Sequence, residues 1–164
     1  MSFFLPTGVR SFFSFEGQRA FAKTPRRRDA TPRFLMFDAY YFSLLLGLRE
    51  GRLGDANRLE AQSFFDAYPD NYRAQAELIA GLLVDSELRR LQIGIGDRAD
   101  IERQMVLLLD LTSTTRLSGH GDQLLNRYAV AGFDVLQDGI MPPDNLEDFL
   151  VAYHALWAGK DPAE

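Results

Sequence analysis

The chain has 164 residues, of which 46% are hydrophobic and 25% are charged, and its net charge is −5. These values are typical of a single globular domain, and the acidic balance argues against unspecific binding of nucleic acid by the whole surface. The absence of cysteine excludes disulfides, thiol catalysis and cysteine-based zinc sites. No apolar run reaches the roughly 20 residues of a membrane-spanning helix, so we expect a cytoplasmic protein without a membrane partner.

The first 33 residues differ in chemistry from the rest. They carry seven lysines and arginines against two acids, whereas residues 34–164 carry eleven against twenty-one. Their prolines and glycines predict a mostly irregular arm. So many aromatic rings are unusual in a solvated segment. They either pack on the chain's own helices or bind a partner subunit through Phe3, Phe4, Phe12, Phe13, Phe15 and Phe21.

The basic residues of this arm can contact phosphates or an acidic protein surface. They are Lys23, Arg26, Arg27, Arg28 and Arg33. The sequence therefore predicts a basic aromatic arm over 1–32, a helical domain over 33–159 and a loose tail over 160–164.

The helical domain begins with a segment over 33–50 that is apolar nearly all round, which is typical of a central buried helix. Asp38 then needs a partner or lies near an exposed end of the helix, and Gly51 ends the helix. A short helix is expected over 55–68, closed by Pro69, and a longer one over 70–92.

Three more helices complete the prediction. One begins after Asp97, one runs over 118–137 with Ser118 as its N-cap, and the last follows 142–144 and ends at Gly159. Gly132 lies on the buried stripe of its helix, where it allows close approach of another backbone. The predicted fold class is therefore all-α, a compact bundle of about five helices.

The loop over 112–121 is the best candidate for a small site. Arg116, Ser118 and His120 can together hold an anion, with help from the amides of the following helix. The alternative is an ordinary connection whose hydroxyl groups cap its own backbone. A small hydrolase or transferase centred on the same residues is a third possibility.

No sequence pattern indicates a metal site or a cofactor. The spacing of His120, Asp122 and Asp110 matches no metal-binding template. Nucleophile elbows, phosphate-binding loops and dinucleotide fingerprints are absent from the sequence. We therefore expect a protein without catalytic activity, metal or cofactor.

Four strings, at 37–42, 78–83, 124–133 and 146–150, resemble small helical accessory proteins encoded beside bacterial DNA-modification and phage-defence genes. The resemblance covers about residues 33–158 and implies a non-catalytic adaptor or accessory subunit of a larger assembly that acts on DNA. The alternative is a direct nucleic-acid-binding module, a homodimer, that uses the arginine-rich arm.

Overall fold

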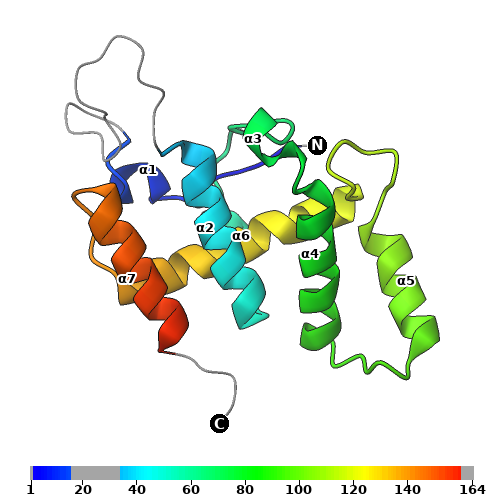
Figure 1. Ribbon diagram of the computed structural model, residues 1–164. Coiled ribbons are helices and arrows are strands. Elements are labelled where there is room, and N and C mark those ends of the chain that lie inside the picture. Colours follow the sequence, from blue (N-terminus) through cyan, green and yellow to red (C-terminus); the bar gives the residue numbers. More distant parts are fainter. Residues whose placement is uncertain (1, 16–33, 160–164) are drawn as a thin grey trace.

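The computed structural model describes residues 2–15 and 34–159 (Figure 1). Over these residues the chain is helical and contains no β-strand, which confirms the predicted all-α class. None of the helices there has the length and apolar character needed to cross a membrane. Five helices have eleven residues or more: α2 (Met36–Glu50), α4 (Ala76–Arg90), α5 (Arg98–Leu108), α6 (Gly119–Gly139) and α7 (Leu146–Ala158).

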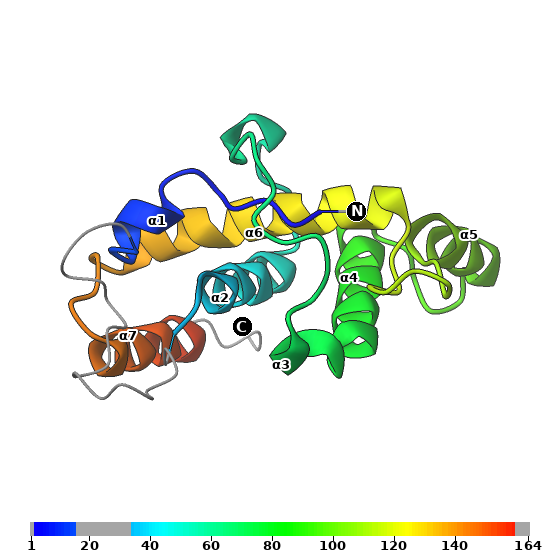
Figure 2. The ribbon, with the colours of Figure 1, turned by 90° about the horizontal axis from the view of Figure 1, so that it is seen from above.

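The core is organised around α2, which crosses α6 in Figure 1 and lies beside it in the view of Figure 2. Two glycines bring the helices into backbone contact. A Cβ atom added to Gly132 would lie 1.7 Å from the carbonyl oxygen of Ser43, and one added to Gly47 would lie 1.8 Å from that of Tyr128. The expected close approach at Gly132 is therefore confirmed.

The boundaries of α2 follow from two residues near its ends. The carboxylate of Asp38 accepts a hydrogen bond from the backbone N–H of Leu35 at 2.5 Å and another from the hydroxyl of Tyr72. This charge-assisted cap satisfies an N–H group at the start of the helix. Gly51 ends the helix with a left-handed φ of 64°. Of the two alternatives for Asp38, the structure shows a partner, although the residue also lies in the first turn of the helix; the stop at Gly51 is as predicted.

The prediction of a helix over 55–68 is wrong. Only the 3₁₀ turn η1 (Ala56–Arg58) forms, and the chain then runs extended beside residues 3–6. The backbone N–H of Phe3 donates to the oxygen of Phe65 at 2.7 Å, and the N–H of Glu60 donates to the oxygen of Leu5 at 2.8 Å. These pairings satisfy backbone groups that a helix would have satisfied internally.

The single helix expected over 70–92 is divided. The short α3 (Asp70–Arg73) ends before α4 begins at Ala76. The break accompanies the packing of Tyr72 on α2, where its ring centroid lies 4.7 Å from that of Phe37 and 5.0 Å from that of Tyr41.

Residues 2–15 belong to the same core as the helices. They include the short α1 (Val9–Phe12), and Phe3, Leu5 and Val9 are buried. The amide of Asn126 on α6 clamps this segment, because it accepts from the N–H of Phe4 at 3.0 Å and donates to the oxygen of Ser2 at 3.1 Å. The expected domain boundary at residue 32 therefore does not separate residues 2–15 from the helical body.

The two ends of α6 hold different helices (Figures 1 and 2). α4 and α5 lie at its N-terminal end, where the hydroxyl of Ser118 accepts from the N–H of Gly121 at 3.0 Å as the predicted cap. α7 lies toward the other end and packs on α2, with the Tyr153 hydroxyl donating to the oxygen of Phe42 at 3.0 Å.

Candidate functional site

The aromatic residues expected to bind a partner are largely inside the protein. Phe3, Phe12 and Phe13 are buried, with edge-on contacts to Phe37 at 5.2 Å, Phe133 at 5.6 Å and Phe149 at 5.1 Å, respectively. The assignment of these three rings to a partner is wrong, because the chain's own helices already cover them. Phe4 and Phe15 are partly exposed.

The rest of the basic aromatic arm lies outside the described residues. This applies to Phe21, Lys23, Arg26, Arg27, Arg28 and Arg33.

The loop over 112–121 contributes only Arg116 of the three predicted anion-binding residues to a surface hollow. Ser118 is engaged by the helix start, because its hydroxyl also donates to the oxygen of Leu107 at 2.6 Å. His120 is exposed on the first turn of α6 and does not line the hollow. The structure therefore does not bring these three side chains together.

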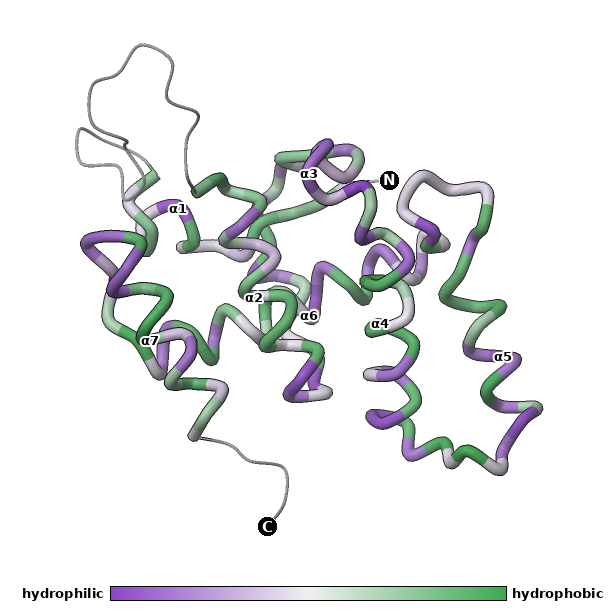
Figure 3. The backbone as a smooth tube through the Cα atoms, viewed as in Figure 1, coloured by the Kyte–Doolittle hydropathy of each residue, from purple (hydrophilic) through white to green (hydrophobic). Residues whose placement is uncertain are grey.

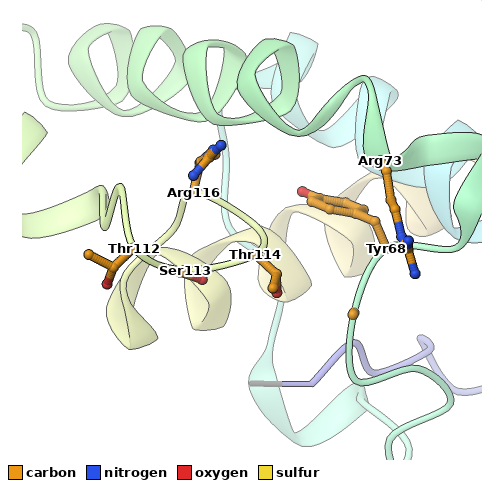
Figure 4. Close-up of a pocket in the computed structure, with 7 residues that line it drawn as sticks. Tyr68, Arg73, Thr112, Ser113, Thr114 and Arg116 are labelled. Atoms are coloured by element: carbon orange, nitrogen blue, oxygen red, sulfur yellow. The ribbon is translucent and has the colours of Figure 1, made fainter.

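The hollow has a volume of about 490 Å³ and lies between two segments distant in sequence (Figure 4). One wall is the loop before α6, and the other is the segment that leads into α3. Its lining contains two arginines, four hydroxyl groups and no carboxylate: Ala67, Tyr68, Arg73, Thr112, Ser113, Thr114 and Arg116. The side chains of this lining are polar or positively charged, apart from Ala67 and the ring of Tyr68.

The hydroxyl of Tyr68 is the most informative atom of this hollow. It is buried, in a side chain only 3% exposed, and it has no hydrogen-bond partner among the described residues. In Figure 4 the ring lies between the two arginines, with the hydroxyl directed toward the side of Thr114 and Arg116. Burial raises the pKa of Tyr68 well above its ordinary value, so the hydroxyl stays protonated as a donor. An unsatisfied buried donor costs about 1–3 kcal/mol.

Arg116 is held by its own loop. One of its terminal nitrogens donates to the oxygen of Leu111 at 2.6 Å, and its Nε lies 3.8 Å from a carboxylate oxygen of Glu77 on α4. Its backbone adopts a left-handed φ of 66°, which costs about 1 kcal/mol for a residue with a side chain. The second arginine, Arg73, makes an exposed ion pair with Asp70 at 3.0 Å.

Sequence reasoning missed Tyr68 and Arg73. Tyr68 lies at the end of the helix predicted over 55–68, which does not form, and Arg73 lies within the continuous helix predicted over 70–92. Some forty residues separate them from the loop, and nothing in a single sequence indicates that the two segments meet.

A second exposed feature lies on α5 and just after it. We call it the apolar segment; its members are Met105, Val106, Leu107 and Leu111. Val106 is 82% exposed and Leu111 is 78% exposed, whereas Leu108 is the buried residue of α5. Figure 3 shows this hydrophobic stretch at the outer edge of the molecule, where α5 joins the following loop.

The hollow and the apolar segment are both suited to binding another molecule. In the part of the chain that the structure describes, no three histidines, aspartates or glutamates are grouped to hold a metal ion. The chain matches no model of a known protein family, no curated protein and no solved structure.

Proposed function

We propose that this protein is a non-catalytic adaptor, an accessory subunit that binds a larger protein through the apolar segment 105–111. The observation that carries the proposal is the exposure of Val106 and Leu111 beside a helix that buries little of its own surface. Large exposed apolar patches are uncommon on monomeric proteins and usually mark interaction surfaces.

The charges around this segment indicate the chemistry of the partner. Residues 76–110 carry seven acids and four arginines; one of the acids, Glu87, is buried and paired with Arg90, which leaves six acids and three arginines. A complementary surface would present apolar side chains at its centre and basic residues at its rim, because opposite charges at the rim steer association. The partner we propose is a protein subunit with such a basic-rimmed apolar patch.

The strings at 37–42, 78–83, 124–133 and 146–150 resemble small accessory proteins of bacterial phage defence, and this resemblance indicates where the partner is expected. It favours a bacterial cytoplasmic complex that acts on DNA in phage defence. In this proposal the larger subunits carry the chemistry, and the adaptor binds them without acting on DNA itself.

The test is a charge placed in the apolar segment. The double variant Val106→Glu with Leu111→Glu should keep the wild-type circular dichroism, because both side chains are exposed, and should lose the co-purified subunit. Val151→Glu is the matched control, because Val151 is also exposed, at 68%, but lies on α7. The control should retain the subunit.

Two results would contradict the proposal. One is retention of the same subunit by the double variant. The other is a wild-type dimer in sedimentation analysis that the double variant converts to a monomer, because the segment would then bind a second copy of the chain.

A further inference from the structure

We infer that the hollow between residues 67–73 and 112–116 binds the phosphate group of a small phosphorylated molecule. This site is separate from the apolar segment and does not depend on the adaptor proposal. Three observations carry it: the composition of the lining, the unpartnered hydroxyl of Tyr68 and the guanidinium of Arg116, which has one short hydrogen bond and one long ion pair.

The lining selects for an anion with several acceptor oxygens. The residues that line the hollow include two arginines and four with hydroxyl groups, and none of them is acidic. Two of these hydroxyls already have protein partners: that of Thr112 donates to Asp110, and that of Ser113 lies 3.0 Å from the hydroxyl of Thr115. Three carboxylates lie near it. Asp122 is largely buried, and its charge adds to burial in raising the pKa of Tyr68. At the rim, Asp70 pairs with Arg73, and Asp110 accepts from the N–H and the hydroxyl of Thr112 at 2.9 and 2.7 Å. These bonds lower the pKa of Asp110, so it remains charged and limits the affinity for anions without blocking the hollow.

The Tyr68 hydroxyl needs an acceptor that the described part of the chain does not provide. It is buried and protonated, and it is directed toward Thr114 and Arg116 (Figure 4). A phosphate oxygen placed between these groups would accept from the phenol and from the guanidinium together. Phosphate offers enough lone pairs for both donors and for a hydroxyl of the loop.

Arg116 is able to turn toward such an oxygen. A guanidinium has five N–H donors. In Arg116 one of them makes a short hydrogen bond to the oxygen of Leu111. The contact with Glu77 is long, at 3.8 Å, and the Glu77 side chain is 84% exposed, so it is a weak competitor for a bound anion.

The size of the hollow indicates that phosphate is one end of the ligand. A volume of about 490 Å³ falls within the range of about 300–1,000 Å³ typical of small-molecule sites and exceeds what one phosphate group fills. Arg73, on the other side of the Tyr68 ring in Figure 4, is placed to contact the remainder of the molecule.

The experiment is calorimetric titration of the full chain at constant ionic strength with three probes: inorganic phosphate, adenosine monophosphate and adenosine. We expect binding of adenosine monophosphate and no binding of adenosine. Binding of inorganic phosphate as well would show that the phosphate group alone suffices, and binding of the monoester alone would show that the rest of the molecule contributes. Failure of both phosphate probes at millimolar concentration would overturn the inference.

The matched variants are Tyr68→Phe and Tyr153→Phe, each of which removes one phenolic hydroxyl. Tyr68→Phe should weaken binding at least tenfold and leave the thermal midpoint unchanged or higher, because its hydroxyl has no partner to lose. Tyr153→Phe should keep the wild-type affinity and lower the midpoint, because it loses the bond to Phe42. Equal affinity of wild type and Tyr68→Phe would overturn the assignment of the hydroxyl and of this hollow.

Arg116→Gln provides the second check. It removes the guanidinium, and binding of either phosphate probe should fall at least tenfold. Unchanged binding in this variant would show that the anion lies elsewhere, and would overturn the inference.

Discussion

At the scale of single residues, burial of Asp122 has the clearest consequence for stability. Its side chain lies in the first turn of α6 and is only 8% exposed, with the hydroxyl of Thr115 at 3.5 Å from one oxygen. Burial raises the pKa of Asp122 from an ordinary 3.8 to about 6. The folded protein therefore binds a proton more readily than the unfolded chain between these two pH values.

The free energy of unfolding should consequently fall as pH rises from about 4 to about 6, by at most about 3 kcal/mol from this group. Asp122→Asn should abolish that part of the pH dependence and raise the unfolding free energy at pH 7, because no charge is then buried. Urea unfolding at several pH values measures both effects. The exposed Asp138→Asn serves as control and should keep the wild-type profile; a parallel profile for Asp122→Asn would assign the dependence to other groups.

Residues of this kind also show where prediction from the sequence ends. The need of Asp38 for a partner could be predicted, because a charge in an otherwise apolar helix has to be paired. That the partner is Tyr72 could not, because it depends on where the chain breaks between α3 and α4. The site residues Tyr68 and Arg73 could not be predicted either, because their position also depends on how the chain folds before α4.

At the scale of elements, the packing of α2 on α6 depends on two helical glycines. Gly132→Ala would place a methyl group against the backbone of Ser43, which cannot move without separating the helices. We expect a loss of about 3 kcal/mol or more in the free energy of unfolding. Gly81→Ala is the matched control, because a Cβ there meets nothing within 4 Å; it should stabilise the protein by about 0.8 kcal/mol through helix propensity.

Chemical denaturation of the two glycine variants measures this difference. Equal stabilities would mean that α2 and α6 do not approach as closely as the structure places them.

The predicted helices succeed where a strong periodic pattern meets a clear boundary residue. Gly51, Ser118 and Gly159 end or begin their helices as predicted. The prediction over 55–68 failed because those residues pair with the N-terminal segment, and such long-range backbone pairing overrides local propensity. α7 begins at Leu146, after its cap Asn145, slightly later than the prolines suggest.

At the scale of the whole molecule, the N-terminal segment completes the core. Phe3 and Phe4 are neighbours in the chain, but Phe3 is buried among Phe37, Tyr40 and Tyr68, whereas Phe4 is partly exposed. Phe3→Ala should therefore destabilise the protein by about 3–5 kcal/mol, and Phe4→Ala by about 1 kcal/mol.

Thermal unfolding of these two variants measures how far residues 2–15 belong to the core. A similar small effect of both would show that the segment docks loosely and is free to serve a partner, as the composition of the arm first suggested.

α6 also fixes a distance. α5 approaches it at Gly121, where an added Cβ would meet the oxygen of Leu108, and α7 approaches it at Gly139, where an added Cβ would meet Leu156. Those two glycines are about 27 Å apart along a continuous helix. α6 is thus a spacer that separates a molecule bound to α5 from a molecule bound to α7. Because the chain has no cysteine of its own, single thiols introduced on α5 and α7 would carry a pair of spectroscopic probes and report that spacing directly.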